Sequence, residues 1–215
     1  SVQAGSRKSY DKMQKYMLTN DLSIQDHFDY INTQMDIDNF MEYEILQIYI
    51  DNQDAGGNIK FWRSMEDGGR WRWILFDTDF GMGHYGRDGY KNNSLAFHRA
   101  PNGPGWPNPP WSTFNLRQLL KNKGFQSRFV SRFLDRLNYT FDSTQVIPGI
   151  DSFANRIQNQ LPRHLKRWNL TMKRWQKEVD RMKEFCKLRP AFMRGFLMEM
   201  FPRFGKEVKL DVRVD

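Results

Sequence analysis

The sequence predicts a mainly α-helical fold with one small β-hairpin. Apolar residues recur with helical spacing over most of the chain, and only residues 59–76 combine short aromatic and β-branched runs with a turn. The length of 215 residues suits one compact domain with a substantial core. Because 15% of the residues are aromatic, Phe and Trp must supply much of the buried area.

The first fifty residues predict three helices. The first covers about residues 9–18, and the second is opened by Ser23, which forms a capping-box pattern with Asp26. The third covers about residues 39–50 and has a broad apolar face. Asp51 directly follows this helix.

The hairpin is predicted from residues 59–63 and 70–76, with two acids and two glycines between them. Residues 82–111 follow, a stretch rich in Gly and Pro with little regular pattern. Irregular stretches of this length inside a compact domain usually have a functional role.

Helices are predicted again beyond Trp111. Their most regular feature is an apolar residue at every fourth position, which indicates a core stripe: Phe125, Phe129, Phe133 and Leu137. The predicted segments are 114–122, 125–139, 143–161, 169–187 and 190–200. The domain is expected to cover 1–205, and 206–215, which alternate like a strand, to begin a linker or a following domain.

Charge and cysteine content limit the choice of partners. Lys and Arg outnumber Asp and Glu by 33 to 25, an excess that favours acidic or phosphate-bearing partners. The basic residues of the C-terminal helices are expected to be solvated. The single cysteine, Cys186, excludes an internal disulfide and predicts a buried thiol. We expect no membrane span, and the absence of a nucleic-acid-binding motif argues against nucleic acid as a partner.

Oxygen-bearing side chains lie at both ends of the hairpin. Asp54 and Asn58 precede it, and Asp77 and Asp79 follow it. Because the hairpin reverses the chain, these side chains should face one another across a gap that could hold a metal ion. Carboxylate and amide oxygens suit Mg²⁺, which binds few protein carboxylates and leaves its other positions to water and phosphate. The four scattered histidines argue against zinc.

The order of these residues is that of a protein kinase. A kinase places a catalytic-loop Asp, a magnesium-binding Asn, a hairpin and an Asp-Phe-Gly motif in succession, followed by an activation segment and a helical C-lobe. Asp54, Asn58 and the pair Phe80 and Gly81 repeat this order. Two details depart from it: Asn58 lies four residues after Asp54 rather than five, and no His-Arg precedes Asp54.

Residues 52–63 (NQDAGGNIKFWR) and 69–81 (GRWRWILFDTDFG) resemble the core signature of the CotH, or spore coat protein H, kinase family. The likeness covers about residues 25–160. It implies an atypical protein-kinase-like fold, of which this chain supplies the C-lobe, and ATP-dependent transfer of phosphate to Ser or Thr of a protein. It also suggests a bacterial cell-surface, secreted or spore-coat location.

By position, Asp54 resembles the catalytic acid, Asn58 a metal-side amide and Asp77 the metal-binding acid, with Asp79 as the alternative metal ligand. The implied cofactors are ATP and Mg²⁺ or Mn²⁺. Nothing before Ser23 predicts the lysine-bearing strand, its Glu partner or the glycine-rich cover of an N-lobe. We therefore expect the N-lobe to be missing or truncated and ATP binding by this chain alone to be weak.

Two other functions fit parts of the sequence. Asp77 and Asp79 after an apolar strand also fit a metal-dependent glycosyltransferase, although no alternating β/α series precedes them. A pseudokinase or surface binding module without catalysis fits the basic charge. Donor-sugar transfer with manganese would distinguish the first, and steeply salt-dependent binding to DNA or RNA would favour the second.

Overall fold

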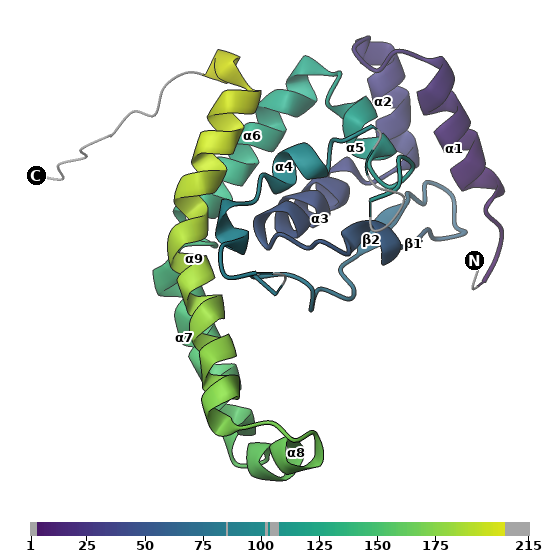
Figure 1. The fold of residues 1–215 in the computed structure, drawn as a ribbon. Coiled ribbons are helices and arrows are strands. Elements are labelled where there is room, and N and C mark those ends of the chain that lie inside the picture. The colour runs from purple at the N-terminus through teal and green to yellow at the C-terminus, as the bar shows by residue number, and fades with distance from the viewer. Residues whose placement is uncertain (1–3, 85, 102, 104–107, 205–215) are drawn as a thin grey trace, which may run out of the picture.

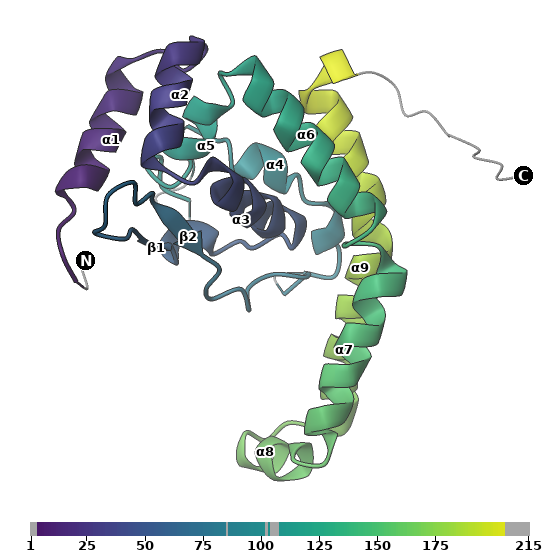
Figure 2. The same ribbon diagram turned by 180° about the vertical axis from the view of Figure 1, so that it is seen from behind.

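A computed structural model describes residues 4–84, 86–101, 103 and 108–204. These residues form a helical body with one two-stranded sheet, from which α7, α8 and the first half of α9 project as an arm (Figures 1 and 2). The expected strand at 206–214 lies outside the described residues. The helices are α1 (Lys8–Thr19), α2 (Gln25–Gln34), α3 (Ile37–Tyr49), α4 (Ser94–Phe97), α5 (Phe114–Leu119), α6 (Lys123–Asn138), α7 (Ser143–Gln158), α8 (Leu161–Arg167) and α9 (Met172–Met200).

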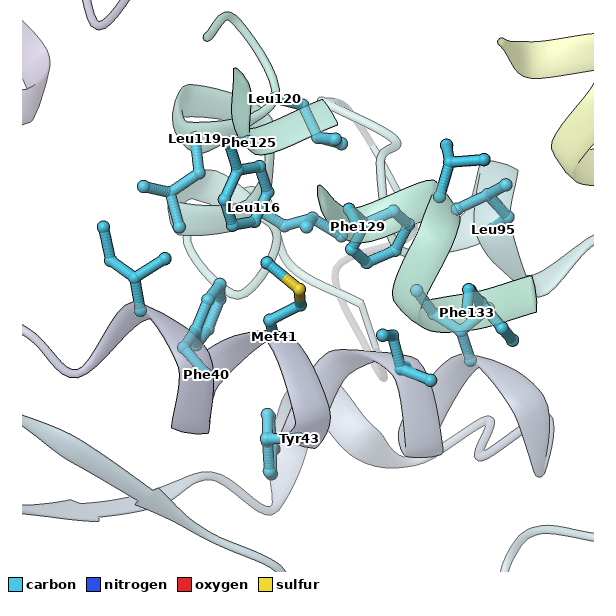
Figure 3. Packing of buried hydrophobic residues seen from close by; sticks show 14 of the residues in the cluster. Phe40, Met41, Tyr43, Leu95, Leu116, Leu119, Leu120, Phe125, Phe129 and Phe133 are labelled. Carbon is cyan, nitrogen blue, oxygen red and sulfur yellow. The ribbon is translucent and has the colours of Figure 1, made fainter. Parts of the chain in front are cut away.

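Helix α3 is the centre of the body. Asp36 caps its first turn by accepting a hydrogen bond from the backbone N–H of Asn39 at 3.1 Å. The predicted apolar stripe of α6 is confirmed, because all four of its residues are at most 1% exposed. Figure 3 shows Phe125, Phe129 and Phe133 of this stripe packed over α3.

The predicted hairpin is confirmed in a shorter form. β1 (Lys60–Trp62) and β2 (Arg72–Ile74) pair antiparallel, with Phe61 opposite Trp73. The side chain of Asn39 fixes the hairpin to α3: its Oδ1 accepts from the N–H of Trp73 at 2.6 Å, and its Nδ2 donates to the carbonyl of Trp73 at 3.3 Å. This amide and the backbone hydrogen bonds of Trp71 with Gln34 and Asp36 set where the hairpin lies relative to α3.

The capping box at Ser23 is wrong. The side chain of Ser23 donates to Asp21 Oδ2 at 2.7 Å, and α2 begins one residue later than expected, with Ile24 at its N-cap. A nearer acceptor therefore competes successfully for the hydroxyl.

The predicted break between the last two helices is also wrong, because α9 continues through Pro190. A proline inside a helix removes one backbone hydrogen bond. Buried residues on both sides of it offset this loss, among them Cys186, Arg189 and Met193. Two short helices were not predicted: α8 at the end of the arm, and α4 within the Gly- and Pro-rich stretch.

Cys186 is free and buried, as predicted, and burial raises the pKa of its thiol to about 11. It is therefore protonated and unreactive at neutral pH. Among the residues placed by the structure, no helix combines the length and apolar character that crossing a bilayer requires.

The stripe of α6 gives a direct test of the core. Phe129 is fully buried, so Phe129→Ala should lower the free energy of unfolding by about 4 kcal/mol through lost burial and a residual cavity. Tyr139, at the end of the same helix, is 72% exposed, and Tyr139→Ala serves as the control. Similar urea midpoints for the two variants would contradict this packing.

Candidate functional site

The candidate site begins at a sharp corner after α3. Asp51 has a left-handed backbone with φ 56°, which is uncommon for a residue other than glycine, and its side chain is only 3% exposed. Asp77 and Met82 also have positive φ, at 54° and 52°. Such conformations are held by the surrounding structure and gather at functional sites.

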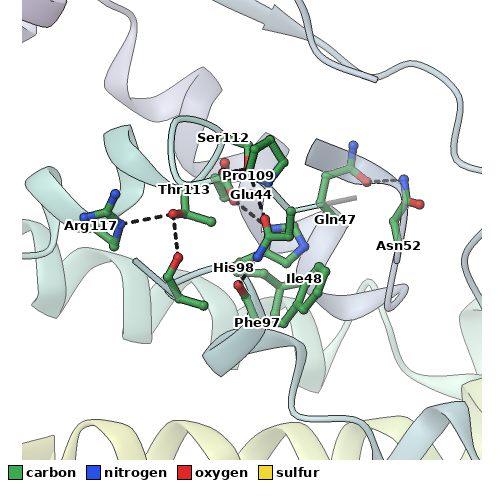
Figure 4. A network of polar contacts seen from close by, with 12 residues as sticks. Glu44, Gln47, Ile48, Asn52, Phe97, His98, Pro109, Ser112, Thr113 and Arg117 are labelled. Carbon is green, nitrogen blue, oxygen red and sulfur yellow. Dashed lines mark hydrogen bonds and ion pairs between the residues drawn. The ribbon is translucent and has the colours of Figure 1, made fainter. Parts of the chain in front are cut away.

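Asn52 joins this corner to the acids after the hairpin. Its Nδ2 donates to Gln47 Oε1 at 2.8 Å, shown in Figure 4, and to the carbonyl of Asp77 at 3.3 Å. Its Oδ1 accepts from the N–H of Asp54 at 3.2 Å. One buried amide thus contacts the segments that carry both Asp54 and Asp77.

A second contact holds the same two segments together. The N–H of Met82 donates to the carbonyl of Ile50 at 2.6 Å. A Cβ on Gly81 would lie 3.0 Å from that carbonyl oxygen, so the close approach requires the glycine. Residues 77–82 therefore pass directly beside the corner that leads to Asp54.

Asp54 and Asn58 flank a 3₁₀ turn at Ala55–Gly57. Asn58 Nδ2 donates to Asp54 Oδ2 at 2.7 Å, which fixes the orientation of the carboxylate. The other oxygen, Oδ1, is buried and has no hydrogen-bond partner among the described residues. A buried carboxylate oxygen without a partner is costly, and a cation or a hydroxyl donor would relieve that cost.

Asp77 and Asp79 lie together on the exposed side of the site. A hydrogen bond shared with Asp79 is the largest of the causes that raise the pKa of Asp77, followed by desolvation and by repulsion from Asp79 and Asp54. Lys60 opposes the rise, while its ammonium group also lies 3.3 Å from the centre of the Phe76 ring. Of the two repulsions, that from Asp79 is the larger.

These features fit a divalent cation. After the hydrogen bond with Asp79 and desolvation, repulsion from Asp79 and Asp54 contributes to the raised pKa of Asp77, and a cation beside Asp77 would oppose that rise. Among the described residues, no three His, Cys, Asp or Glu side chains are arranged to hold a metal by themselves. Mg²⁺ does not need three, because it takes one or two protein carboxylates and completes its shell with water and phosphate oxygens.

Comparison with protein-family models identifies the family to which this kinase-like order of residues belongs. The family model described as CotH kinase protein matches residues 1–193. The chain belongs to the CotH kinase family. No curated protein and no solved structure gives a match. The match confirms the resemblance carried by residues 52–81 and extends beyond residues 25–160 at both ends.

The sequence analysis of this CotH family member missed Arg189, which is fully buried. Its guanidinium uses all five N–H donors: they reach the carbonyls of Ile48 and Tyr49 at the end of α3, those of Tyr90 and Asn92, and the hydroxyl of Ser94, at 2.6–2.9 Å. Burial lowers its pKa to about 10, although Asp51 opposes the change, so the group stays charged at neutral pH.

Arg189 supports the corner through Asp51. The hydroxyl of Ser94 accepts from Arg189 and donates to Asp51, and Asn92 donates to Asp51 Oδ2 at 2.8 Å. The buried carboxylate and the buried guanidinium are thus bridged by one hydroxyl. The contacts of Asp51 and Arg189 join the end of α3, residues 90–94 and α9.

A second set of polar contacts reaches α3 at Glu44. His98 Nδ1 lies 3.1 Å from Glu44 Oε2, and both side chains are buried (Figure 4). Asn108 and Thr113 bond back to the carbonyls of Phe97 and Ala100. These contacts hold the described part of residues 97–113 against the helix that presents Gln47 to Asn52.

A signal for Arg189 was present in the sequence: it shares one helical face with Phe185, Cys186, Met193 and Leu197, all buried. A charged residue inside an apolar stripe is rarely left without partners. The predicted helix break before Pro190 concealed this pattern.

Replacing Arg189 should destabilise the whole fold. Arg189→Met keeps most of the volume but leaves four carbonyl groups without their donor and removes the positive charge behind the Ser94 hydroxyl that bridges to Asp51, which should cost about 3 kcal/mol or more of unfolding free energy. Arg174→Met, on the exposed face of the same helix, is the control. Equal denaturation midpoints for Arg189→Met and wild type would show that the buried bridge contributes nothing.

Proposed function

We propose that this chain is the magnesium-binding, catalytic part of an ATP-dependent protein kinase that transfers the γ-phosphate to Ser or Thr of a protein. The observation that carries the proposal is the joint anchoring of the Asp54 and Asp77 segments by Asn52. Membership of the CotH kinase family supports a kinase-like function at the level of the family.

In this proposal Asp54 acts as the general base. One of its oxygens accepts from Asn58 at 2.7 Å, and the other has no partner among the described residues and is available to an acceptor hydroxyl. A positioned carboxylate that takes the hydroxyl proton contributes about 10²- to 10⁴-fold to a transfer rate.

Asp77 and Asn58 would hold the magnesium ion, with Asp79 beside Asp77 as a further oxygen ligand. The ion would neutralise charge on the ATP phosphates when bound. Asn58 would contact both Asp54 and the magnesium ion, because its Nδ2 donates to Asp54 and its side-chain carbonyl oxygen can bind the ion. Lys60, which opposes the rise in the pKa of Asp77, would offer its positive charge to a phosphate oxygen.

A glycosyltransferase gains no support from the fold. Enzymes that hold a sugar nucleotide at the end of a parallel sheet need several strands with crossover helices. The described residues contain a two-stranded antiparallel sheet, and helices precede it in the chain.

Two substitutions separate binding from transfer. Asp77→Asn should weaken magnesium-dependent ATP binding by at least about tenfold. Replacing a residue that only hydrogen-bonds to a metal ligand already weakens metal binding by about that factor, and Asp77 is proposed as a direct ligand. Asp54→Asn should leave that binding within a few-fold and reduce phosphate transfer by about 100-fold or more. Binding is measured by calorimetry with and without magnesium, and transfer with labelled ATP.

Asp67→Asn, an exposed acid in the hairpin turn, is the matched control and should behave as wild type. Unchanged transfer in both Asp54→Asn and Asp77→Asn would contradict the proposal. Tight magnesium–ATP binding by the wild type without any transfer would instead identify a pseudokinase.

A further inference from the structure

The end of the arm carries nearly all of the excess positive charge of the chain. Residues 156–177, called the basic tip below, comprise the end of α7, all of α8 and the start of α9. They contain seven Lys and Arg and no Asp or Glu, against a net charge of +8 for the whole sequence: Arg156, Arg163, Lys166, Arg167, Lys173, Arg174 and Lys177.

These seven side chains are all exposed. The acidic residues of the arm form their ion pairs with basic residues outside this group. Among the described residues, the ion pairs of the arm join Arg181 to Glu178 and Lys183 to Asp151, and none of these four residues belongs to the basic tip. Like charges gathered without acids repel one another, so the tip gains free energy from an anionic partner.

Large apolar side chains are exposed among these cations. Trp168 is 59% exposed, Ile157 50% and Met172 39%. They are not needed to hold the tip together, because Leu161 and Leu165 of α8 are 6% and 5% exposed and pack toward α7 and α9. A soluble surface usually avoids placing several such groups side by side.

We propose that the basic tip binds the surface of an anionic lipid membrane. Basic residues interspersed with exposed Trp and aliphatic side chains are the composition that lies at a lipid interface, where cations meet headgroup phosphates and apolar groups enter the acyl boundary. The aliphatic Ile157 and Met172 favour lipid over nucleic acid, because bases are bound by stacking on aromatic rings.

The shape of the molecule permits this contact. Figures 1 and 2 show α8 at the far end of the arm, away from α1, α2 and the hairpin. A flat surface can therefore reach the tip without first meeting those elements. The inference is independent of the proposed kinase activity, since it uses none of the residues assigned to phosphate transfer.

The test is co-sedimentation of the chain with phosphatidylcholine vesicles, prepared with and without phosphatidylglycerol. The chain should bind only the anionic vesicles and should dissociate at high salt. Replacing Lys166, Lys173 and Lys177 together by Ala should weaken binding about 100-fold, at about fivefold for each lysine near the surface. Trp168→Ala should weaken it about tenfold by removing the inserted ring.

The control removes the same charge from the body: Lys8, Lys12 and Lys15, exposed on α1, are replaced by Ala and should leave binding within a few-fold. Circular dichroism checks that each variant is folded. Equal loss of binding in both triple variants, or full binding by Trp168→Ala, would overturn the proposal. So would tighter binding to a single-stranded oligonucleotide than to the anionic vesicles.

Discussion

The buried carboxylate of Asp51 is the constraint on which the rest of the site depends. It turns the chain sharply after α3 and is held by Asn92 and Ser94, with the guanidinium of Arg189 behind Ser94. Burying a charge is costly unless it is paired and hydrogen-bonded, so these partners must all be in place for the corner to form. The position of Asn52, and with it the contact to the Asp77 segment, follows from that corner.

The site itself combines a rigid base with mutually repelling acids. Asn58 orients the carboxylate of Asp54 and the side chain of Asn52 holds its backbone N–H, whereas Asp77 and Asp79 are both exposed and Asp79 raises the pKa of Asp77. Like charges so close repel, and a cation would oppose that repulsion. In the proposed function, that cation would be an ion that brings phosphate with it, rather than a metal bound permanently by protein ligands alone.

The sequence predicted the parts of this structure that are encoded locally. The hairpin and the core stripe of α6 both depend on short-range spacing. Arg189 could not be assigned in the same way, because its carbonyl partners lie up to 141 residues away in the chain. Propensity also misled at Pro190, where tertiary contacts keep α9 continuous.

The central claim is that Asp54 and Asp77 border one cation site for nucleotide-bound magnesium. Crystals grown with Mn²⁺ and a non-hydrolysable ATP analogue test it most directly, because anomalous scattering locates the ion. The account predicts a manganese peak about 2 Å from a carboxylate oxygen of Asp77, with phosphate oxygens completing its shell. An ordered nucleotide whose manganese lies against other residues, with none at Asp77, would contradict it.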